Sequence, residues 1–573
     1  MKKTYSNHSF YFIFFQNQHQ RLRTLVLLCL QLSFFSHAQN TTEVDAFFEE
    51  FNATDAPGIA VSVTKNGKPL YQNVFGMANL EYDIPITQQT PFHVASLSKQ
   101  FTAFLILKLQ DEGLLSIEDN VRRFIPELPD YGTPITINHL LTHSSGIRDQ
   151  WRLLELAGWR LDDVIKTEQV FQLITQQKEL NFSPGENFKY SNSGYTLLAI
   201  IIERLTKMSF AEYAQESIFE PLNMDNSFFY DDHEEIIKNR AYSYKKLNGR
   251  LKKSNLNFAT VGPTSLFTTI EDMNKWASNF RNPIIGSEEI FKAMNEKAKK
   301  SDGSLSNYAK GQFVRNYKGL NMIYHSGSDA GYRCYFARFP ELGYTFALFA
   351  NGSYINAYDE IKKLINYYLK SHFPVNDQEE EKNTEFKYDE QLFTQLTKEE
   401  LKIFEGTYFD REEHQFWQVE LVNDTLYCKG GVLGEKMALI PIGARAFKIK
   451  GTPYDISVNF KENQYHEPIL EFRIPDVMWL WLVKEEAVDT SKYLGTYFSE
   501  ELDTSYHLIE QENELFLTHQ KLDNIKITPI RKNYFSAKNR NFSTIRFQRN
   551  NLNKIEGFSI SNGSIERLIF LRK

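Results

Sequence analysis

The sequence predicts a mixed α/β domain, with helices packed on an antiparallel sheet, followed by two small antiparallel β-barrel domains. A hairpin pattern at 57–76 and three strand patterns after residue 320 enclose several apolar helical patterns, an order typical of such a mixed domain. Residues beyond 400 contain an internal repeat of alternating strand patterns. The 30 Tyr and 46 Phe residues suit the pleated, half-buried surfaces of β-structure.

The chain is too long for one hydrophobic core, so its 573 residues predict several domains. The net charge of −7 is small for this length and gives no support to nucleic-acid binding. The expected division is a signal peptide at 1–38, the α/β domain at 39–375, an acidic linker at 376–392, and barrel domains at 393–486 and 487–573.

The N-terminus has the pattern of an export signal. Arg21 and Arg23 precede the apolar run 24–35, and Ser36-His37-Ala38 follows as a small-x-small cleavage motif. The apolar run is shorter than the roughly 20 residues that a membrane-spanning helix needs. We therefore expect a periplasmic or secreted protein, with an uncleaved N-terminal membrane anchor as the alternative.

The elements of the α/β domain follow from local patterns. Residues 59–64 alternate, Asn66-Gly67 is typical of a tight turn, and a strand pattern returns at 70–75. An apolar helix is expected from Ser96 to about residue 109. Further helices are expected at 137–141, 195–205 and 269–280, and strands at 321–325, 332–339 and 344–350.

An acidic segment and the repeat follow. Residues 374–390 contain three consecutive glutamates and almost no apolar residues, so we expect a solvated linker that few contacts cross. Beyond it, the hexapeptide at 404–409 (FEGTYF) recurs at 493–498 (YLGTYF). The similarity continues at three pairs of positions: Trp417 with Tyr506, Val419 with Leu508, and Leu426 with Leu515. Two copies of alternating strands with short polar turns predict the two barrels.

Ser96 and Lys99 lie at the start of the expected apolar helix. Because residues three apart share one face of a helix, the Lys99 amine can reach the Ser96 hydroxyl. Burial near the positive end of a helix favours the neutral form of a lysine, which can then act as a base. The same spacing occurs at Ser243 and Lys246 in a polar stretch, and an ordinary helix N-cap is the structural alternative for Ser96.

Tyr190-Ser191-Asn192 is a second candidate element. A tyrosine hydroxyl can relay a proton, and an Asn amide can bind both a lysine and a substrate carbonyl. The same Tyr-x-Asn spacing occurs at 5–7 and 354–356, so the pattern is not specific by itself.

His325-Ser326-Gly327 is the third candidate element, at the end of an expected strand. A glycine there lets a substrate approach the backbone closely. The N–H of Ser328 can join the N–H of Ser96 in an oxyanion hole.

The three elements occur in the order Ser-x-x-Lys, Tyr-x-Asn and His-x-Gly, and this combination is far more specific than any one of them. With it, residues 45–370 resemble the serine β-lactamase family in its class C-like branch. That branch also contains D-aminopeptidases, D-alanyl-D-alanine carboxypeptidases and esterases. Supporting stretches are 139–146 (HLLTHSSG), 184–186 (PGE), 191–195 (SNSGY) and 262–272 (GPTSLFTTIED). The two barrels resemble the C-terminal barrel domains of D-aminopeptidases.

The resemblance implies a serine hydrolase that forms an acyl-serine intermediate without a metal or other cofactor. It implies Ser96 as the nucleophile, Lys99 and Tyr190 as partners in the base role, and Asn192 as a substrate-binding residue. The expected substrate is a D-amino-acid peptide or amide, or a small ester. The alternatives are a β-lactamase, a D-alanyl-D-alanine carboxypeptidase, and a catalytically silent protein that binds ligands or senses peptidoglycan.

His325 departs from the family, which usually has lysine there to hold a substrate carboxylate. An unperturbed histidine titrates near pH 6.5, so if His325 holds a substrate carboxylate, we expect this binding to weaken as the pH rises through neutrality. If it does not, His325 is expected to orient the deacylating water or to shape the pocket. The departure resembles the aminopeptidase and esterase branches.

Neither metal binding nor a disulfide is expected. His139 and His143 are four residues apart, but no glutamate follows His139, and the resemblance accounts for both as scaffold. Cys29 falls in the signal, and Cys334 and Cys428 fall in different expected domains. The expected partner is a small-molecule or peptide substrate, including cell-wall fragments, and not a nucleic acid. The oligomeric state stays open.

Overall fold

The computed structural model describes residues 42–374, 393–410, 416–430, 436–449, 455–474, 478–485 and 488–573. The predicted signal peptide and acidic linker lie outside these residues. The chain divides into two compact units. Unit 1 comprises Met1–Gly146, Leu161–Gln172 and Phe182–Val375, and unit 2 comprises Ile147–Arg160, Leu173–Asn181 and Asn376–Lys573. The predicted domain boundaries stay predictions.

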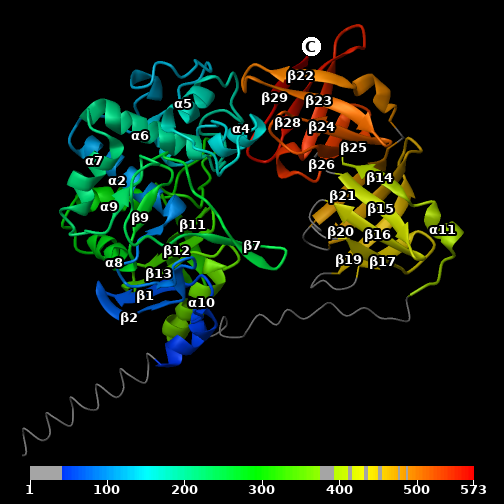
Figure 1. The fold of residues 1–573 in the computed structure, drawn as a ribbon. Helices are drawn as coiled ribbons and strands as arrows, with labels where there is room; N and C mark the ends of the chain where they lie inside the picture. The colour runs from blue at the N-terminus through cyan, green and yellow to red at the C-terminus, as the bar shows by residue number, and fades with distance from the viewer. Residues whose placement is uncertain are drawn as a thin grey trace, which may run out of the picture. The chain divides into compact units, whose positions relative to one another are not determined.

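Unit 1 is the expected mixed α/β domain (Figure 1). Its six-stranded sheet has the order β10-β11-β12-β13-β1-β2, and all neighbouring strands are antiparallel. The strands are β10 (Phe313–Tyr317), β11 (Leu320–Asp329), β12 (Tyr332–Phe339), β13 (Tyr344–Ala350), β1 (Ile59–Lys65) and β2 (Lys68–Phe75). The first and last parts of the domain therefore pair in its centre, through β1 and β13.

The hairpin of β1 and β2 is confirmed. Asn66 and Gly67 both have positive φ angles, 51° and 76°, which the favoured two-residue hairpin turn requires. Lys65 pairs with Lys68 across this turn.

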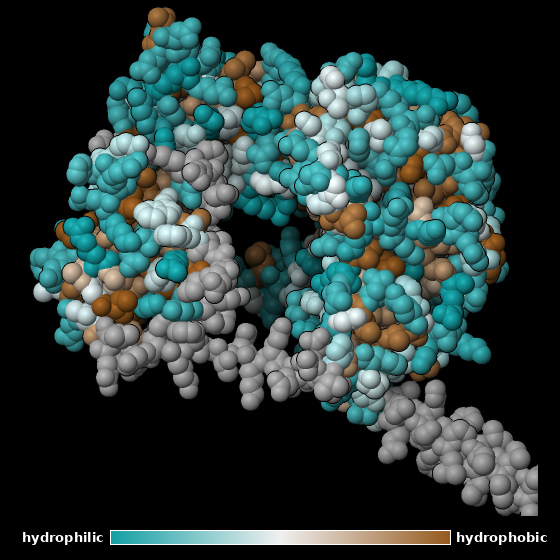
Figure 2. Space-filling view, turned by 180° about the vertical axis from the view of Figure 1, so that it is seen from behind, coloured by the Kyte–Doolittle hydropathy of each residue, from teal (hydrophilic) through white to brown (hydrophobic). Residues whose placement is uncertain are grey.

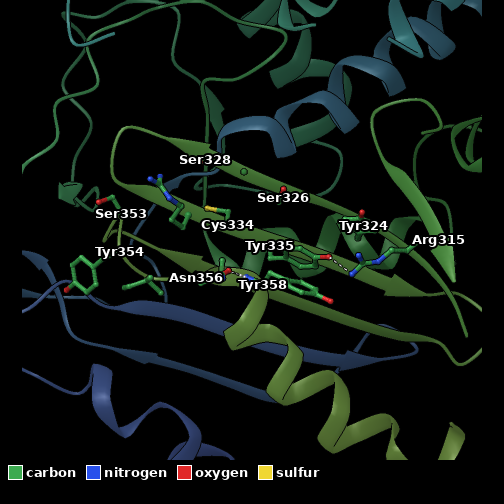
Figure 3. Close-up of a pocket in the computed structure, with 14 residues that line it drawn as sticks. Arg315, Tyr324, Ser326, Ser328, Cys334, Tyr335, Ser353, Tyr354, Asn356 and Tyr358 are labelled. Carbon is green, nitrogen blue, oxygen red and sulfur yellow. Dashed lines mark hydrogen bonds between the residues drawn. The ribbon is translucent and has the colours of Figure 1, made fainter. Parts of the chain in front are cut away.

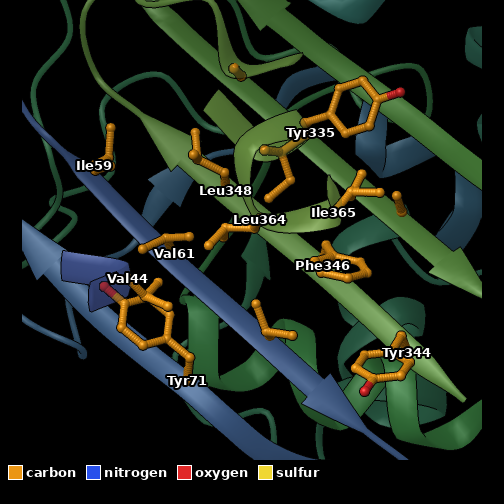
Figure 4. Packing of buried hydrophobic residues seen from close by; sticks show 14 of the residues in the cluster. Val44, Ile59, Val61, Tyr71, Tyr335, Tyr344, Phe346, Leu348, Leu364 and Ile365 are labelled. Atoms are coloured by element: carbon orange, nitrogen blue, oxygen red, sulfur yellow. The ribbon is translucent and has the colours of Figure 1, made fainter. Parts of the chain in front are cut away.

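Both faces of the sheet are covered. On β1, Ile59, Val61 and Val63 belong to a buried cluster that includes Ile361 and Leu364 of α10 (Ala357–Leu369), as Figure 4 shows in part. On the opposite face, the Ser62 hydroxyl donates to Asn274 of α8 (Ile270–Asn279) at 2.8 Å. Because successive strand residues face opposite sides, a strand between two layers is buried almost throughout, as β1 is.

The central helix α2 (Ser98–Asp111) packs against α6 (Asn192–Thr206) and α9 (Glu288–Asn295). It is buried on nearly all sides, which explains its continuous apolar sequence. Other helices are α3 (Ile137–Leu141), α4 (Gln150–Leu156), α5 (Thr167–Thr175) and α7 (Phe210–Ala214). Small sheets contain β3 (Met77–Asn79) with β4 (Ile84–Pro85), β5 (Phe92–His93) with β9 (Leu266–Thr268) and β6 (Phe228–Phe229), and β7 (Tyr244–Leu247) with β8 (Arg250–Lys253).

Unit 2 contains the two predicted barrels, each closed from eight strands. The first has β14 (Gly406–Phe409), β15 (Phe416–Val422), β16 (Thr425–Gly430), β17 (Met437–Pro441), β18 (Ala446–Ile449), β19 (Ile456–Glu462), β20 (Pro468–Ile474) and β21 (Met478–Lys484), preceded by α11 (Lys398–Lys402). The second has β22 (Gly495–Ser499), β23 (Thr504–Gln511), β24 (Glu514–Thr518), β25 (Ile525–Arg531), β26 (Tyr534–Ala537), β27 (Thr544–Arg549), β28 (Ile555–Ser561) and β29 (Leu568–Arg572).

The repeat in the sequence is a repeat of structure. The Tyr408 hydroxyl donates to the Phe404 carbonyl, and the Tyr497 hydroxyl donates to the Tyr493 carbonyl in the same way. Tyr408 pairs with Trp417 across β14 and β15, and Tyr497 pairs with Tyr506 across β22 and β23. The alignment of Trp417 with Tyr506, made from the sequence repeat, is therefore confirmed by the strand register.

The expectation that few contacts cross the linker is wrong. Arg148, from the first half of the chain, is fully buried in unit 2 and forms an ion pair with Glu501 at 2.7 Å. Asn181 exchanges hydrogen bonds with the backbone of Ser564 and Glu566. Two short segments of the N-terminal half thus pack with the second barrel.

Candidate active site

Ser96 lies in a 3-10 turn, η2 (Ala95–Leu97), and not in the first turn of the α-helix as expected. Ala95 has a φ of 50°, a left-handed conformation that is strained for a residue with a side chain. The Ser98 hydroxyl donates to the Ala95 carbonyl at 2.6 Å and fixes this turn. Backbone strain of this kind is commonly held at functional sites.

Gly327 of β11 lies directly against this turn. A Cβ at Gly327 would lie 2.2 Å from the Val94 carbonyl oxygen and 3.2 Å from the Ala95 Cβ. The missing side chain therefore brings the strand close to the turn that carries Ser96. This packing role differs from the expected one, which was close approach by a substrate.

Lys99 is fully buried, and its Nζ has three oxygen neighbours in hydrogen-bond range. They are Ser96 Oγ at 3.1 Å, Asn192 Oδ1 at 2.8 Å and the Pro263 carbonyl at 2.7 Å. The Asn192 and Pro263 oxygens can only accept hydrogen bonds, whereas a hydroxyl can also donate. The same geometry thus fits a neutral amine that donates to Asn192 and Pro263 and accepts the Ser96 proton.

The Tyr190-Ser191-Asn192 segment leads into α6, where Asn192 is the first residue. The Tyr190 ring lies near Lys99, whose Nζ is 4.9 Å from the ring centroid. The structure therefore brings Ser96, Lys99, Tyr190 and Asn192 together.

His143 is a neighbour that the sequence reasoning treated only as scaffold. Its Nδ1 accepts the Ser191 N–H at 3.2 Å, and its ring centroid is 4.2 Å from that of Tyr190. Burial, followed by the charge that Lys99 carries when its amine is protonated, lowers the pKa of His143 well below its usual value. His143 is therefore neutral and supports the Tyr190 segment. His139 instead caps α3 by accepting the Thr136 N–H, so the two histidines have different roles.

His325 is almost fully buried, and this changes its expected behaviour. Burial, followed by the charge that Lys99 carries when its amine is protonated, lowers the pKa of His325 to about 3. Its Nδ1 lies 2.6 Å from the Ser326 carbonyl, so Nδ1–H donates there, and Nε2 lies 3.3 Å from the Tyr308 hydroxyl. The expected titration of His325 near pH 6.5 is therefore wrong, and its role in substrate binding stays a prediction.

The second half of β11 has a free edge within the described part of the chain. Strand β10 pairs with Leu320–Tyr324, and β12 pairs with β11 on the other side up to Asp329. The strand thus continues beyond the predicted end, through His325-Ser326-Gly327 to Ser328. Unpaired N–H and C=O groups of a strand edge can bind an extended substrate.

Ser326 and Ser328 are exposed, and their side chains line a pocket of about 500 Å³ (Figure 3). They alternate with His325 and Gly327, whose neighbours are Lys99 and the Ser96 turn. The remaining lining residues are Arg315, Tyr324, Gly327, Arg333, Cys334, Tyr335, Ser353, Tyr354, Ile355, Asn356, Ala357 and Tyr358. Gly327 therefore belongs both to this pocket and to the contact with the nucleophile turn.

Arg315 is the notable charge of this pocket. Its guanidinium lies 4.5 Å from the Tyr324 ring centroid and 5.2 Å from that of Tyr358, and it reaches the Tyr335 hydroxyl at 3.5 Å. These rings hold the cation in place. No sequence motif indicated Arg315, because its position depends on the pairing of β10 with β11.

The competing motifs have other environments. The Ser243 hydroxyl donates to the Ser254 carbonyl at 2.7 Å and accepts the Gly331 N–H at 3.0 Å, while Lys246 is exposed. Cys334 and Cys428 are buried free thiols. Within the described ranges, no three His, Cys, Asp or Glu residues cluster as metal ligands, and no helix is long and apolar enough to cross a membrane.

Comparisons with known proteins agree with this geometry. Residues 44–366 match the family model described as Beta-lactamase. A penicillin-binding protein of Bacillus subtilis is 29% identical over 341 residues, which cover 56% of this chain and 73% of that protein. Protein flp of Staphylococcus aureus is 27% identical over 54% of this chain and 62% of its own length. The octameric penicillin-binding protein homologue from Pyrococcus abyssi has 27% identity and a TM-score of 0.54, and the match covers 77% of this chain and 99% of that one.

Proposed function

The chain belongs to the beta-lactamase family of serine hydrolases, and from this premise we propose that it cleaves an amide or ester through an acyl-Ser96 intermediate. The observation that carries the proposal is the hydrogen-bonded set of Ser96, Lys99 and Asn192. The proposed substrate is a D-amino-acid peptide or amide, or a small ester. We also propose that the protein is exported, which cell fractionation would test.

In the proposed reaction, the neutral Lys99 amine takes the proton from the Ser96 hydroxyl as Oγ attacks the substrate carbonyl. Asn192 and the Pro263 carbonyl keep the two N–H bonds of that amine directed away from Ser96, so its lone pair faces the hydroxyl. Tyr190 takes part in passing the proton to the leaving amine or alcohol. Water then attacks the acyl carbonyl: its hydroxyl joins the acyl group, and its other proton passes through the same base to Ser96 Oγ as the C–O bond to serine breaks.

The N–H groups of Ser96 and Ser328 form the proposed oxyanion hole. The close packing of Gly327 against Val94 and Ala95 supports this assignment, since it brings the free edge of β11 to the nucleophile turn. Backbone donors fixed in this way stabilise the charge that develops on the carbonyl oxygen.

Labelling with a fluorophosphonate or a penicillin, followed by peptide mass spectrometry, tests the proposal. We expect one adduct on Ser96, and we expect Ser96→Ala and Lys99→Ala to lower kcat at least about a thousandfold while the fold is kept. Ser243→Ala is the matched control and should retain full activity. A folded wild-type protein without an adduct on Ser96 would favour the non-catalytic, peptidoglycan-sensing alternative.

Arg315 does not favour the alternative of a D-alanyl-D-alanine carboxypeptidase. Arg315 pairs with Met322 and lies beside Tyr358 of α10, so it faces the α10 side of the sheet. His325 and Gly327 face the opposite side, where the Ser96 turn lies.

A further inference from the structure

Two exposed tryptophans lie side by side on the first barrel. Trp479 and Trp481 are 58% and 47% exposed, and their ring centroids are 5.5 Å apart with the planes at 34°. Other exposed hydrophobic side chains mostly occur singly, and Figure 2 shows such residues interspersed among hydrophilic ones on one face of the molecule. Scattered exposed hydrophobic residues are ordinary, whereas two adjacent exposed tryptophans call for an explanation.

The strand register places polar groups beside each ring. Trp479 pairs with Arg473 of β20, and Trp481 pairs with Glu471 of the same strand. One strand further, Ser457 of β19 pairs with Arg473, and Asn459 pairs with Glu471. Because paired strand residues face the same side, two rows of ring, charged group and small polar group lie on the outer surface of the barrel.

The charged side chains of this surface carry both signs and contact the rings or one another. The Arg473 guanidinium is 5.7 Å from the Trp479 ring centroid, and the Lys461 amine is 5.8 Å from that of Trp481. Lys461 also forms an ion pair with Glu471, whose side chain is only 6% exposed. A surface with both signs of charge favours neither a nucleic acid nor an anionic membrane.

The second barrel provides an internal comparison. By strand pairing, Ser559 and Ile569 of the second barrel stand where Glu471 and Trp481 stand in the first. Both barrels are closed and have the same tyrosine-to-carbonyl hydrogen bond, so the barrel fold does not require the tryptophans or their polar neighbours.

We propose that Trp479, Trp481, Asn459, Glu471 and Arg473 form a binding surface for an extended, β-1,4-linked polysaccharide. The faces of such sugar rings are apolar C–H surfaces that stack on indole rings, and their edges carry hydroxyls that need donors and acceptors together. Arg473 supplies donors and Asn459 supplies both donors and acceptors, while Glu471 holds the Lys461 amine beside the Trp481 ring. Two rings fixed on one strand give a rigid support for an extended chain, and this support needs little ordering on binding.

Binding of chitohexaose and cellohexaose to the full-length protein, measured by calorimetry and by tryptophan fluorescence, tests this surface. We expect one of the two to bind, and we expect Trp479→Ala/Trp481→Ala to weaken that binding at least tenfold. Glu471→Gln should weaken it by a smaller factor. Tyr465→Ala is the matched control, because Tyr465 is a 73% exposed aromatic residue of the same barrel outside the two rows.

The outcomes separate this site from the active site. Turnover of a small ester should be the same in the double tryptophan variant and the wild type, and the melting temperature should show that the variant is folded. Absence of binding to both oligosaccharides, or equal binding by wild type and double variant, would overturn the proposal. Tryptophan-dependent flotation with anionic vesicles, or tryptophan-dependent dimerisation, in place of sugar binding would assign the surface to another occupant and would also overturn it.

Discussion

His325 determines how the active site responds to pH. Because its pKa lies at about 3, His325 stays neutral throughout the range in which such an enzyme is assayed. We therefore predict that KM for a carboxylate-bearing substrate has the same pH profile between pH 5 and 8 in the wild type and in His325→Gln. A rise of KM between pH 6 and 8 that occurs in the wild type alone would contradict this prediction.

The same group makes folding depend on pH. The pKa of His325 is lower in the folded chain than its usual value near 6.5, so the unfolded chain binds the proton more readily. This contribution to stability is present above pH 6.5 and is lost as the pH falls from 6.5 towards 3, with a slope of at most about 1.4 kcal/mol per pH unit. Urea unfolding at pH 7 and pH 4.5 should show a smaller acid loss for His325→Gln than for the wild type. Equal losses of stability in the two proteins would show that a group other than His325 takes up the proton on unfolding.

His143 allows a prediction about positioning. His143→Gln supplies an oxygen that can accept the Ser191 N–H, whereas His143→Phe supplies an aromatic ring without an acceptor atom. We predict that His143→Phe lowers kcat by about tenfold or more with little change of KM, and that His143→Gln recovers part of this loss. Equal kcat values for the two variants would show that the hydrogen bond to Ser191 does not position Tyr190.

At the scale of single residues, the sequence predicted which side chains meet and not their protonation. Ser96, Lys99, Tyr190 and Asn192 were predicted from motif spacing, and the structure brings them together. The low pKa of His325 depends on burial and on Lys99, two consequences of tertiary packing that spacing does not encode. Arg315 had no motif at all.

At the scale of elements, the nucleophile turn and strand β11 act as a pair. Gly327→Ala would place a Cβ 2.2 Å from the Val94 carbonyl, so the strand or the turn must shift. We predict a loss of kcat of about tenfold or more, because displacements of about 1 Å at a catalytic group are costly. Gly113→Ala is the control: it strains a positive φ of 74° after α2 but meets no neighbouring atom, so it should lower stability and leave kcat unchanged. If both variants retain kcat, the contact at Gly327 does not position Ser96.

Elements with strong local signals were predicted well. The Asn66-Gly67 turn fixed the hairpin, and the strands at 332–339 and 344–350 match β12 and β13. The start of the first apolar helix was wrong, because the positive φ of Ala95 converts the residues around Ser96 into a 3-10 turn. Strand β11 runs past its predicted end because pairing with β12 extends it through polar residues that a strand pattern does not include.

At the scale of the whole molecule, the repeat predicted both barrels, whereas the grouping of residues 147–160 and 173–181 with the second barrel was not predictable. That grouping depends on side chains hundreds of positions apart, such as Arg148 and Glu501, for which a single sequence carries no local signal. Cutting the chain near residue 380 therefore removes stabilising contacts of residues 147–160 and 173–181, which the acidic linker alone does not indicate.

Substitutions of Glu501 and Glu500 in the full-length chain show how much the contacts of residues 147–181 with the second barrel contribute to stability. Glu501 is the buried partner of Arg148, and its carboxylate also accepts the Lys178 N–H, whereas the neighbouring Glu500 forms an exposed ion pair with the Lys178 amine. Removing one partner of a buried pair leaves an uncompensated buried charge, so we predict that Glu501→Ala destabilises unit 2 by roughly 3–5 kcal/mol in urea unfolding.

Glu500→Ala should have almost no effect, because solvent screens its pair. A chain that ends at residue 375 lacks Glu501 and the Glu566 carbonyl, to which Arg148 also donates, so it should melt below the temperature at which the full-length protein loses activity. Equal unfolding curves for Glu501→Ala and Glu500→Ala, together with a truncated chain as heat-stable as the whole protein, would instead show that residues 147–160 fold without the second barrel.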